Sequence, residues 1–164
     1  MPLTFSPGGT TTPTATIPVG MHIGTIACGL TKIVEYGLSF ADFATDKVGP
    51  PPQGARFDIT VEGSFTGSKL TGTFTAVDYV YVRADGRVEL HPHGEITTND
   101  GAKIAYFLDG VVYAVEGSPL PHHLGIGTLS TASAKYAWVN GLEILSQGPM
   151  DLAKREMRLE VYSV

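Results

Sequence analysis

Hydrophobic and polar residues alternate with a period of two along much of this chain. The alternation is clear between Phe57 and Phe65, and again between Met157 and Tyr162. It is typical of a strand with one face buried and the other in contact with solvent. Helical spacing is scarce: only Ser39 to Thr45 and Pro149 to Ala153 are expected to form about one turn each. The pattern therefore predicts an all-β protein.

Two hairpin turns are predicted in the middle of the chain, at Asp85-Gly86 and Asp100-Gly101. These dipeptides favour two-residue type I′ turns, because such turns need positive φ angles that Asp and Gly tolerate. The turns bracket Arg87 to Asn99, which becomes the central strand of a three-stranded meander. Its predicted neighbours are Val77 to Arg83 and Ala102 to Leu108.

Further strands are predicted on both sides of this meander, which gives roughly eight to ten antiparallel strands in total. They include Gly20 to Ala27, Thr31 to Gly37, Arg56 to Phe65, Lys69 to Thr75 and the C-terminal runs. An all-β chain of this kind closes into a barrel or packs as a sandwich, because both arrangements protect strand edges. We favour a single closed antiparallel β-barrel.

The length of 164 residues is that of one domain, long enough to bury a core without disulfides or metals. Residues 1–16 are rich in Thr, Pro and Gly and are predicted to form a flexible arm. Residues 17–164 are predicted to form the β-barrel domain. The Pro/Gly stretch from Lys47 to Arg56 is too short to separate two domains.

The charge pattern argues against a nucleic-acid partner, because the net charge is −5 and no cluster of Lys and Arg is present. Cys28 is the single cysteine, which excludes an internal disulfide and a cysteine-based zinc cluster. The N-terminus lacks the features of a signal peptide, and the apolar stretch from Ile17 to Val34 is interrupted by His22 and Lys32. We expect a cytoplasmic protein with no membrane partner.

The register of the meander decides which side chains share a face. With two-residue turns, His93 lies opposite Asp78 on one side and Leu108 on the other. The shared face then carries Asp78, Val80, Val82, His91, His93, Glu95, Ile104, Tyr106 and Leu108. An apolar face interrupted by a few ionisable groups is typical of a ligand cavity, so we predict that this face points inward. The alternative is that the opposite, more apolar face is the interior and the histidines lie in solvent.

Four segments of the chain resemble successive motifs of one family. They are "GSFTGSKLTGTF" from Gly63, "DYVYVRADGRVEL" from Asp78, "ITTNDGAKIAY" from Ile96 and "KYAWVN" from Lys135. In this order and spacing they resemble the small β-barrel family numbered 3237 among the domains of unknown function. The resemblance covers about residues 20–164. It implies a closed, calycin-like or lipocalin-like antiparallel barrel with a central cavity, and it leaves the activity open.

The resemblance also extends to individual residues of the family motifs. The family's Asp before an aromatic residue corresponds to Asp78, and its Tyr-x-Trp-x-Asn motif corresponds to Tyr136, Trp138 and Asn140. Where the family pattern reads Asp-x-Arg, this chain has His91-Pro92-His93. A fixed cation is thereby replaced by an imidazole that can gain or lose a proton near neutral pH.

The favoured chemistry is cofactor-independent acid/base catalysis. Asp78 opposite His93 would fix the imidazole tautomer and make His93 a general base, with His91 on the same face. Tyr106 and Glu95 would donate protons. Such a set suits an isomerase, cyclase or lyase that acts on a mostly apolar carbonyl or phenolic, natural-product-like molecule. The residues predicted to bind this substrate are Val80, Val82, Ile104, Leu108, Tyr136, Trp138 and Asn140.

Two other functions remain open. The barrel could bind a small ligand without catalysis, or it could be a metal-dependent enzyme, because His-x-His on a strand places both imidazoles on one face. A third metal ligand would then come from Glu95, His122 or His123. The His122-His123 pair is otherwise interpreted as loop surface near the cavity, and Pro92 is unusual between two ligands. No cofactor or metal is expected in the favoured interpretation, and exposed strand surface is compatible with a homodimer.

Overall fold

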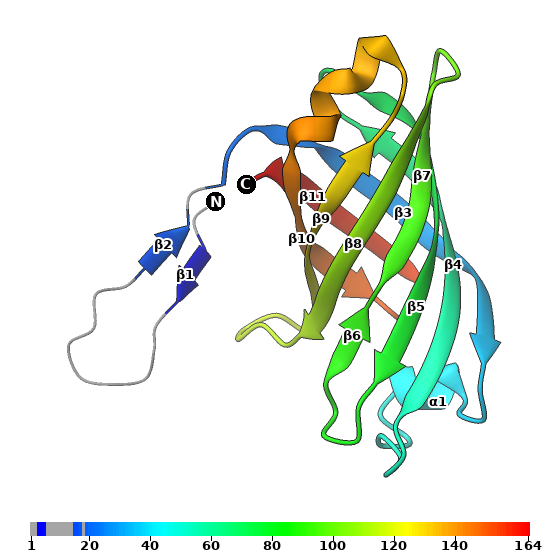
Figure 1. Ribbon diagram of the computed structural model, residues 1–164. Coiled ribbons are helices and arrows are strands. Elements are labelled where there is room, and N and C mark those ends of the chain that lie inside the picture. The colour runs from blue at the N-terminus through cyan, green and yellow to red at the C-terminus, as the bar shows by residue number, and fades with distance from the viewer. Residues whose placement is uncertain (1–2, 6–14, 18) are drawn as a thin grey trace.

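The computed structural model describes residues 3–5, 15–17 and 19–164 (Figure 1). Strands β1 (Leu3–Phe5) and β2 (Ala15–Ile17) pair antiparallel with one another. Most of the arm predicted for residues 1–16 lies outside the described residues. No helix of the described part of the chain is long and apolar enough to cross a membrane.

The remaining strands form one antiparallel sheet that closes on itself, in the order β4-β3-β11-β10-β9-β8, then β6 and β7, then β5, which pairs back to β4. Their bounds are β3 (His22–Glu35), β4 (Ala55–Thr66), β5 (Thr71–Val82), β6 (Val88–Leu90), β7 (Pro92–Thr98), β8 (Lys103–Tyr113), β9 (His122–Ser130), β10 (Glu143–Asp151) and β11 (Glu156–Ser163). Because β6 and β7 occupy one position in succession, the barrel has eight strand positions. The predicted closed β-barrel is confirmed.

Two short helices lie at opposite ends of the barrel (Figure 1). Helix α1 (Phe40–Ala44) begins after Ser39, whose hydroxyl accepts a hydrogen bond from the Asp42 N–H at 3.3 Å. This confirms the turn predicted at Ser39 to Thr45. The 3₁₀ helix η1 (Ala134–Gly141) covers the other end. The helical turn predicted at Pro149 to Ala153 is wrong, because β10 continues to Asp151.

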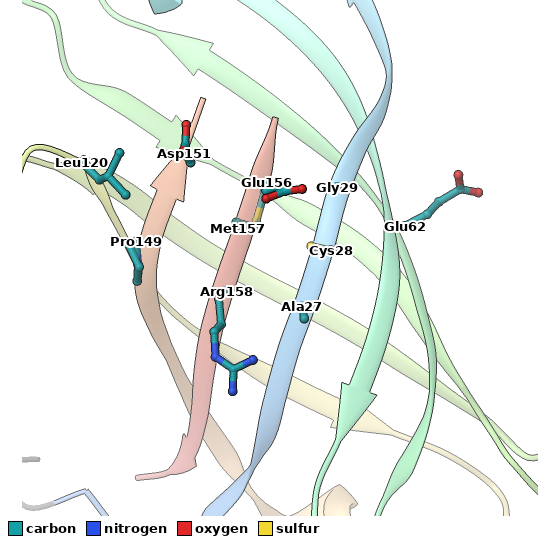
Figure 2. Close-up of a pocket in the computed structure, with 10 residues that line it drawn as sticks. All are labelled: Ala27, Cys28, Gly29, Glu62, Leu120, Pro149, Asp151, Glu156, Met157 and Arg158. Atoms are coloured by element: carbon teal, nitrogen blue, oxygen red, sulfur yellow. The ribbon is translucent and has the colours of Figure 1, made fainter. Parts of the chain in front are cut away.

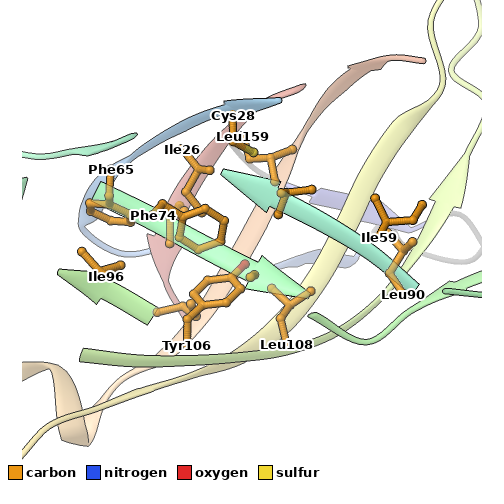
Figure 3. Packing of buried hydrophobic residues seen from close by; sticks show 14 of the residues in the cluster. Ile26, Cys28, Ile59, Phe65, Phe74, Leu90, Ile96, Tyr106, Leu108 and Leu159 are labelled. Carbon is orange, nitrogen blue, oxygen red and sulfur yellow. The ribbon is translucent and has the colours of Figure 1, made fainter. Parts of the chain in front are cut away.

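Large apolar side chains fill the interior toward the η1 end. Phe65, Leu70, Ile96, Leu129 and Val139 are each at most 2% exposed there. Figure 3 shows how such side chains from opposite walls meet inside the barrel. Burying large apolar side chains is the main stabilising contribution to a fold of this kind. The space that is left unfilled lies closer to the α1 end.

The register predicted for the meander is wrong by one residue, and the reason lies in the turns. Arg83 N–H donates to Arg87 O, and Thr98 N–H donates to Ala102 O. Each hairpin therefore has a three-residue loop, in which Gly86 and Gly101 take φ angles of 88°. Three-residue loops of this type place a glycine in the left-handed region at their last position. One additional loop residue shifts every cross-strand residue pair of the hairpin by one position.

This shift turns the central strand over. His93 pairs with Val77 and Phe107, and Asp78 pairs with Pro92. Because side chains alternate between faces, a shift of one residue exchanges the inner and outer sets. Pro92, Gly94 and Ile96 now point inward. His91, His93 and Glu95 lie on the outer surface, although Asp78, Val80 and Tyr106 point inward as predicted.

The turn geometry predicts a specific cost for removing either glycine. A Cβ at Gly86 or Gly101 would contact nothing within 4 Å, so the cost comes from the backbone conformation alone. We expect Gly86→Ala and Gly101→Ala each to lower the free energy of unfolding by about 1 kcal/mol. Gly141→Ala is the matched control, because its Cβ also meets open space without a positive φ. Urea unfolding of the three variants would contradict this geometry if all lost the same stability.

Candidate functional site

Three connected hollows run from the α1 end into the barrel. One of them, which we call the chamber, has a volume of about 60 Å³ and is lined by apolar side chains that include Phe40, Phe57, Ile59, Val80 and Leu90. The inner pocket, of about 20 Å³, lies deeper and includes Phe74, Pro92, Tyr106 and His123. Four residues border both spaces, namely Val61, Asp78, Met150 and Met157. A ligand that entered the chamber would therefore meet Asp78 on its way inward.

The mouth is a wider hollow of about 620 Å³ at the end of the barrel that carries α1. It is bordered by α1, by Gly86 in the β5–β6 turn, by the connection between β8 and β9, and by the end of β10. Phe43, Val88, Val112 and Leu152 border both the mouth and the chamber. The mouth is thus the route by which a small molecule would reach the chamber.

Asp78 is the acidic group of the cavity, and it is held at an interruption of the neighbouring strand. His91 lies between β6 and β7, and its backbone N–H donates to Asp78 Oδ1 at 2.8 Å. Pro92 follows and has no N–H to offer the sheet. Asp78 is only 9% exposed, and this burial raises the pKa of its carboxyl to about 7, although the His91 N–H lowers it in part. The group can therefore take up or release a proton near neutral pH.

Tyr106 borders the inner pocket beside Asp78. Its ring meets the ring of Phe74 edge to face, with centroids 5.2 Å apart. Complete burial raises the pKa of the Tyr106 hydroxyl. The phenol is therefore neutral at physiological pH and can act as a hydrogen-bond donor.

His123 is a third titratable group of the inner pocket, after Asp78 and Tyr106, and its position differs from the prediction. It lies inside β9 with a side chain facing the interior, not on a loop surface, and is 3% exposed. Burial lowers the pKa of its imidazole to about 4, so the ring is neutral at pH 7. Its Nε2 atom has no hydrogen-bond partner among the described residues.

The predicted Asp78–His93 pair is not formed, because the shifted register places His93 on the outer face while Asp78 points inward, and the three outer residues of the central strand have other partners. His91 Nδ1 lies 2.6 Å from Asp109 Oδ1 at the surface. The His93 ring packs between Tyr79 and Phe107, at 5.7 and 4.7 Å between centroids. Glu95 pairs with Lys103 on the exposed face. Their predicted position inside the cavity is therefore wrong.

The motif residues Tyr136, Trp138 and Asn140 lie on η1, at the end of the barrel opposite the mouth. The Tyr136 hydroxyl donates to Asp100 Oδ1 at 2.8 Å, and Asn140 makes two hydrogen bonds with the backbone of Thr131. Trp138 packs against the core. None of the three borders the chamber or the inner pocket, so their contacts fasten η1 to the barrel.

The other residues predicted to bind a substrate all face the interior. Val80 borders the chamber directly. Val82, Ile104 and Leu108 are fully buried in the packed core. These three line neither the chamber nor the inner pocket.

A further hollow of about 460 Å³ crosses the wall formed by β10, β11, β3 and β4 (Figure 2). Glu62, Asp151, Glu156 and Arg158 border it. Burial raises the pKa of the Cys28 thiol, which also borders it, to about 12, so this sulfur stays protonated. No group of three His, Cys, Asp or Glu side chains in the described residues, here or at His91 and His93, is arranged to hold a metal ion.

One sequence signal could have identified His123. The segment from His123 to Leu129 alternates in period two, with Gly125 and Gly127 at the inward positions between them. The two glycines hide the alternation, because they leave no apolar side chain at these positions. The inward Leu108 side chain fills the space next to Gly125 instead.

Comparisons with known proteins place the chain among barrels of the same shape. A family model described as "Protein of unknown function (DUF3237)" matches residues 40–164. No curated protein matches the chain.

Solved structures share the fold at low sequence identity. A protein of unknown function from Clostridium acetobutylicum ATCC 824 has a TM-score of 0.70 and 20% identity, over 88% of this chain and 97% of that one. A β-barrel-like protein from Acinetobacter baumannii AYE has a TM-score of 0.69 and 19% identity, over 94% and 99%. An enzyme from Penicillium herquei has a TM-score of 0.54 and 18% identity, over 86% and 96%.

The buried carboxyl predicts a pH dependence of stability. The pKa of Asp78 rises from 3.8 to about 7 on folding, so between these pH values the folded state binds more protons than the unfolded state. Stability therefore falls as the pH rises through this window, and the loss is complete above pH 7. At about 1.36 kcal/mol per pKa unit, the loss amounts to about 4 kcal/mol.

Asp78→Asn removes this dependence. Relative to wild type, we expect the variant to gain about 4 kcal/mol in free energy of unfolding between pH 4 and pH 8, measured by urea unfolding. Asp109→Asn is the control, because Asp109 is an exposed carboxyl that should not change the pH profile in this way. A constant difference between Asp78→Asn and wild type across this range would contradict the assignment.

Proposed function

The chain belongs to the DUF3237 family, and from this premise we propose that it is a cofactor-independent acid/base enzyme. In this proposal it is an isomerase, cyclase or lyase that acts on a mostly apolar carbonyl or phenolic molecule. Asp78 is the proton acceptor, and the chamber holds the apolar body of the substrate. The observation that carries the proposal is a single buried carboxyl with a pKa of about 7 at the inner border of an apolar cavity.

The environment of Asp78 supports a role as general base. A carboxylate removed from water, with one backbone N–H as its hydrogen-bond donor, is more basic than an exposed carboxylate. Enzymes raise carboxyl pKa values toward neutrality by burial for this purpose. No ion pair to Asp78 is formed in the described residues, so no cationic side chain holds this carboxyl in its charged form.

The proposed step needs no cofactor, because protons balance within one substrate molecule. The Asp78 carboxylate removes a proton from a carbon next to a carbonyl group, or from a phenolic hydroxyl. The resulting enolate or phenolate rearranges, closes a ring or expels a leaving group. The protonated Asp78 then returns the proton to another atom of the product, or to the leaving group. The neutral Tyr106 hydroxyl borders the same inner pocket as Asp78 and would stabilise negative charge on the substrate oxygen.

The apolar lining supports the substrate class. Leu30, Phe57, Ile59, Val80 and Leu90 offer no hydrogen bonds to a polar substrate body. Cavities of this kind select apolar ligands and orient them with a few polar groups. The structure from Penicillium herquei, which is described as an enzyme, supports the idea that a barrel of this shape can hold an active site.

A generic probe tests the base without knowledge of the natural substrate. 5-Nitrobenzisoxazole opens to a coloured nitrophenolate when a base removes one proton, and an apolar site accelerates this reaction. We expect the wild-type rate to rise about tenfold per pH unit below pH 7 and to level off above it, since the carboxylate is the active form. Asp78→Asn should lower the rate at pH 8 by 10²-fold or more, on the order of the usual contribution of a general base.

Two outer-surface variants serve as controls for this probe. His93→Ala and Asp109→Asn alter groups that the cavity does not contain, so both should retain the wild-type rate and pH profile. If the wild-type rate does not exceed that of Asp78→Asn, the proposal is wrong. If a small aromatic ligand still binds in that case, the barrel is a binding protein without catalysis.

A further inference from the structure

His123 is a buried polar group that the proposed proton transfer does not use. It shares the inner pocket with Asp78 and Tyr106. Its strand β9 pairs with β8, the last strand of the meander, so His123 and Asp78 come from different strands of the barrel wall. Its neighbours along the sheet, Gly148 on β10 and Val112 on β8, offer it no polar side chain. The imidazole therefore faces the pocket with Nε2 free of any partner among the described residues.

An unpartnered buried nitrogen is an unusual feature of a folded protein. Most buried polar groups are hydrogen-bonded, because leaving one unpaired after removal from water is costly. An apolar residue of similar size at this position would avoid the cost. The free Nε2 is therefore best explained by a group that occupies the inner pocket when a ligand is bound.

We propose that His123 Nε2 binds a hydroxyl group of the substrate, which is therefore a hydroxylated aromatic ring or an enol. A neutral imidazole nitrogen is either a donor or an acceptor, depending on its tautomer. A carbonyl oxygen could pair only with the donor form, whereas a hydroxyl group pairs with both forms. The inference rests on the proposed function, since it assigns the substrate class of the same cavity.

Two methionines lie where the chamber meets the inner pocket. Met150 and Met157 pair across β10 and β11 and border both spaces. Methionine side chains adapt their shape easily, and their sulfur atoms make favourable contacts with aromatic rings. A chamber of about 60 Å³ is small for a ring, so the two side chains must turn aside as the ring enters. The ring then lies among apolar groups with its hydroxyl next to His123 and Asp78.

A matched pair of ligands tests the inference. 2-Naphthol and 2-methylnaphthalene differ in a hydroxyl against a methyl group, and their affinities can be measured by fluorescence titration at pH 6, where His123 is neutral. We expect wild type to bind 2-naphthol at least about tenfold more tightly, since the hydroxyl satisfies a buried nitrogen. His123→Phe should lose this preference and keep its affinity for 2-methylnaphthalene. His122→Phe, which alters the neighbouring side chain outside the pocket, should retain the wild-type preference.

A second measurement does not depend on the folding of a variant. The ¹⁵N resonance of His123 Nε2 in the wild-type protein should shift with 2-naphthol and not with 2-methylnaphthalene. An unchanged resonance with saturating 2-naphthol, or a full hydroxyl preference in His123→Phe, would overturn the inference. Failure of the proposed function is distinguishable, because it appears as an unchanged proton-transfer rate in Asp78→Asn.

Discussion

The hydrogen bond from the His91 backbone N–H to Asp78 Oδ1 connects the architecture of this barrel to its chemistry. The central strand position is divided into β6 and β7 at His91, and Pro92 offers no N–H there. The interruption leaves one backbone donor facing a largely apolar interior. That donor permits a carboxyl to remain buried, and it is too weak a partner to keep the pKa of Asp78 in its ordinary range.

Two titratable groups in one cavity respond to burial in opposite directions. Burial raises the pKa of Asp78 to about 7 and lowers that of His123 to about 4, because both changes favour the uncharged form. Between these values the cavity carries no charge on either group, which suits an apolar ligand. Stability contributed by His123 is lost as the pH falls from 6.5 through 4, whereas that of Asp78 is lost as the pH rises toward 7.

Much of the fold followed from local pattern, and much of the site did not. Alternating residues such as those from Phe57 to Phe65 predicted the strands, and the Asp-Gly pairs predicted both turns. The number of loop residues is set by how strands meet in space, and one residue decides whether His93 or Pro92 faces Asp78. The inward position of His123 in a strand was missed for a related reason, since its inward neighbours on β9 are glycines whose packing partners come from β8.

The basicity of the cavity is tested most directly by titration of the Asp78 carboxyl itself. The side-chain ¹³C resonance of Asp78, assigned by its loss in Asp78→Asn, can be followed by NMR between pH 3 and pH 9. We expect a titration midpoint close to 7, because burial disfavours the carboxylate. A midpoint near the ordinary value of 3.8 would contradict this expectation, since the carboxyl would then be ionised throughout the neutral range and would have no special basicity.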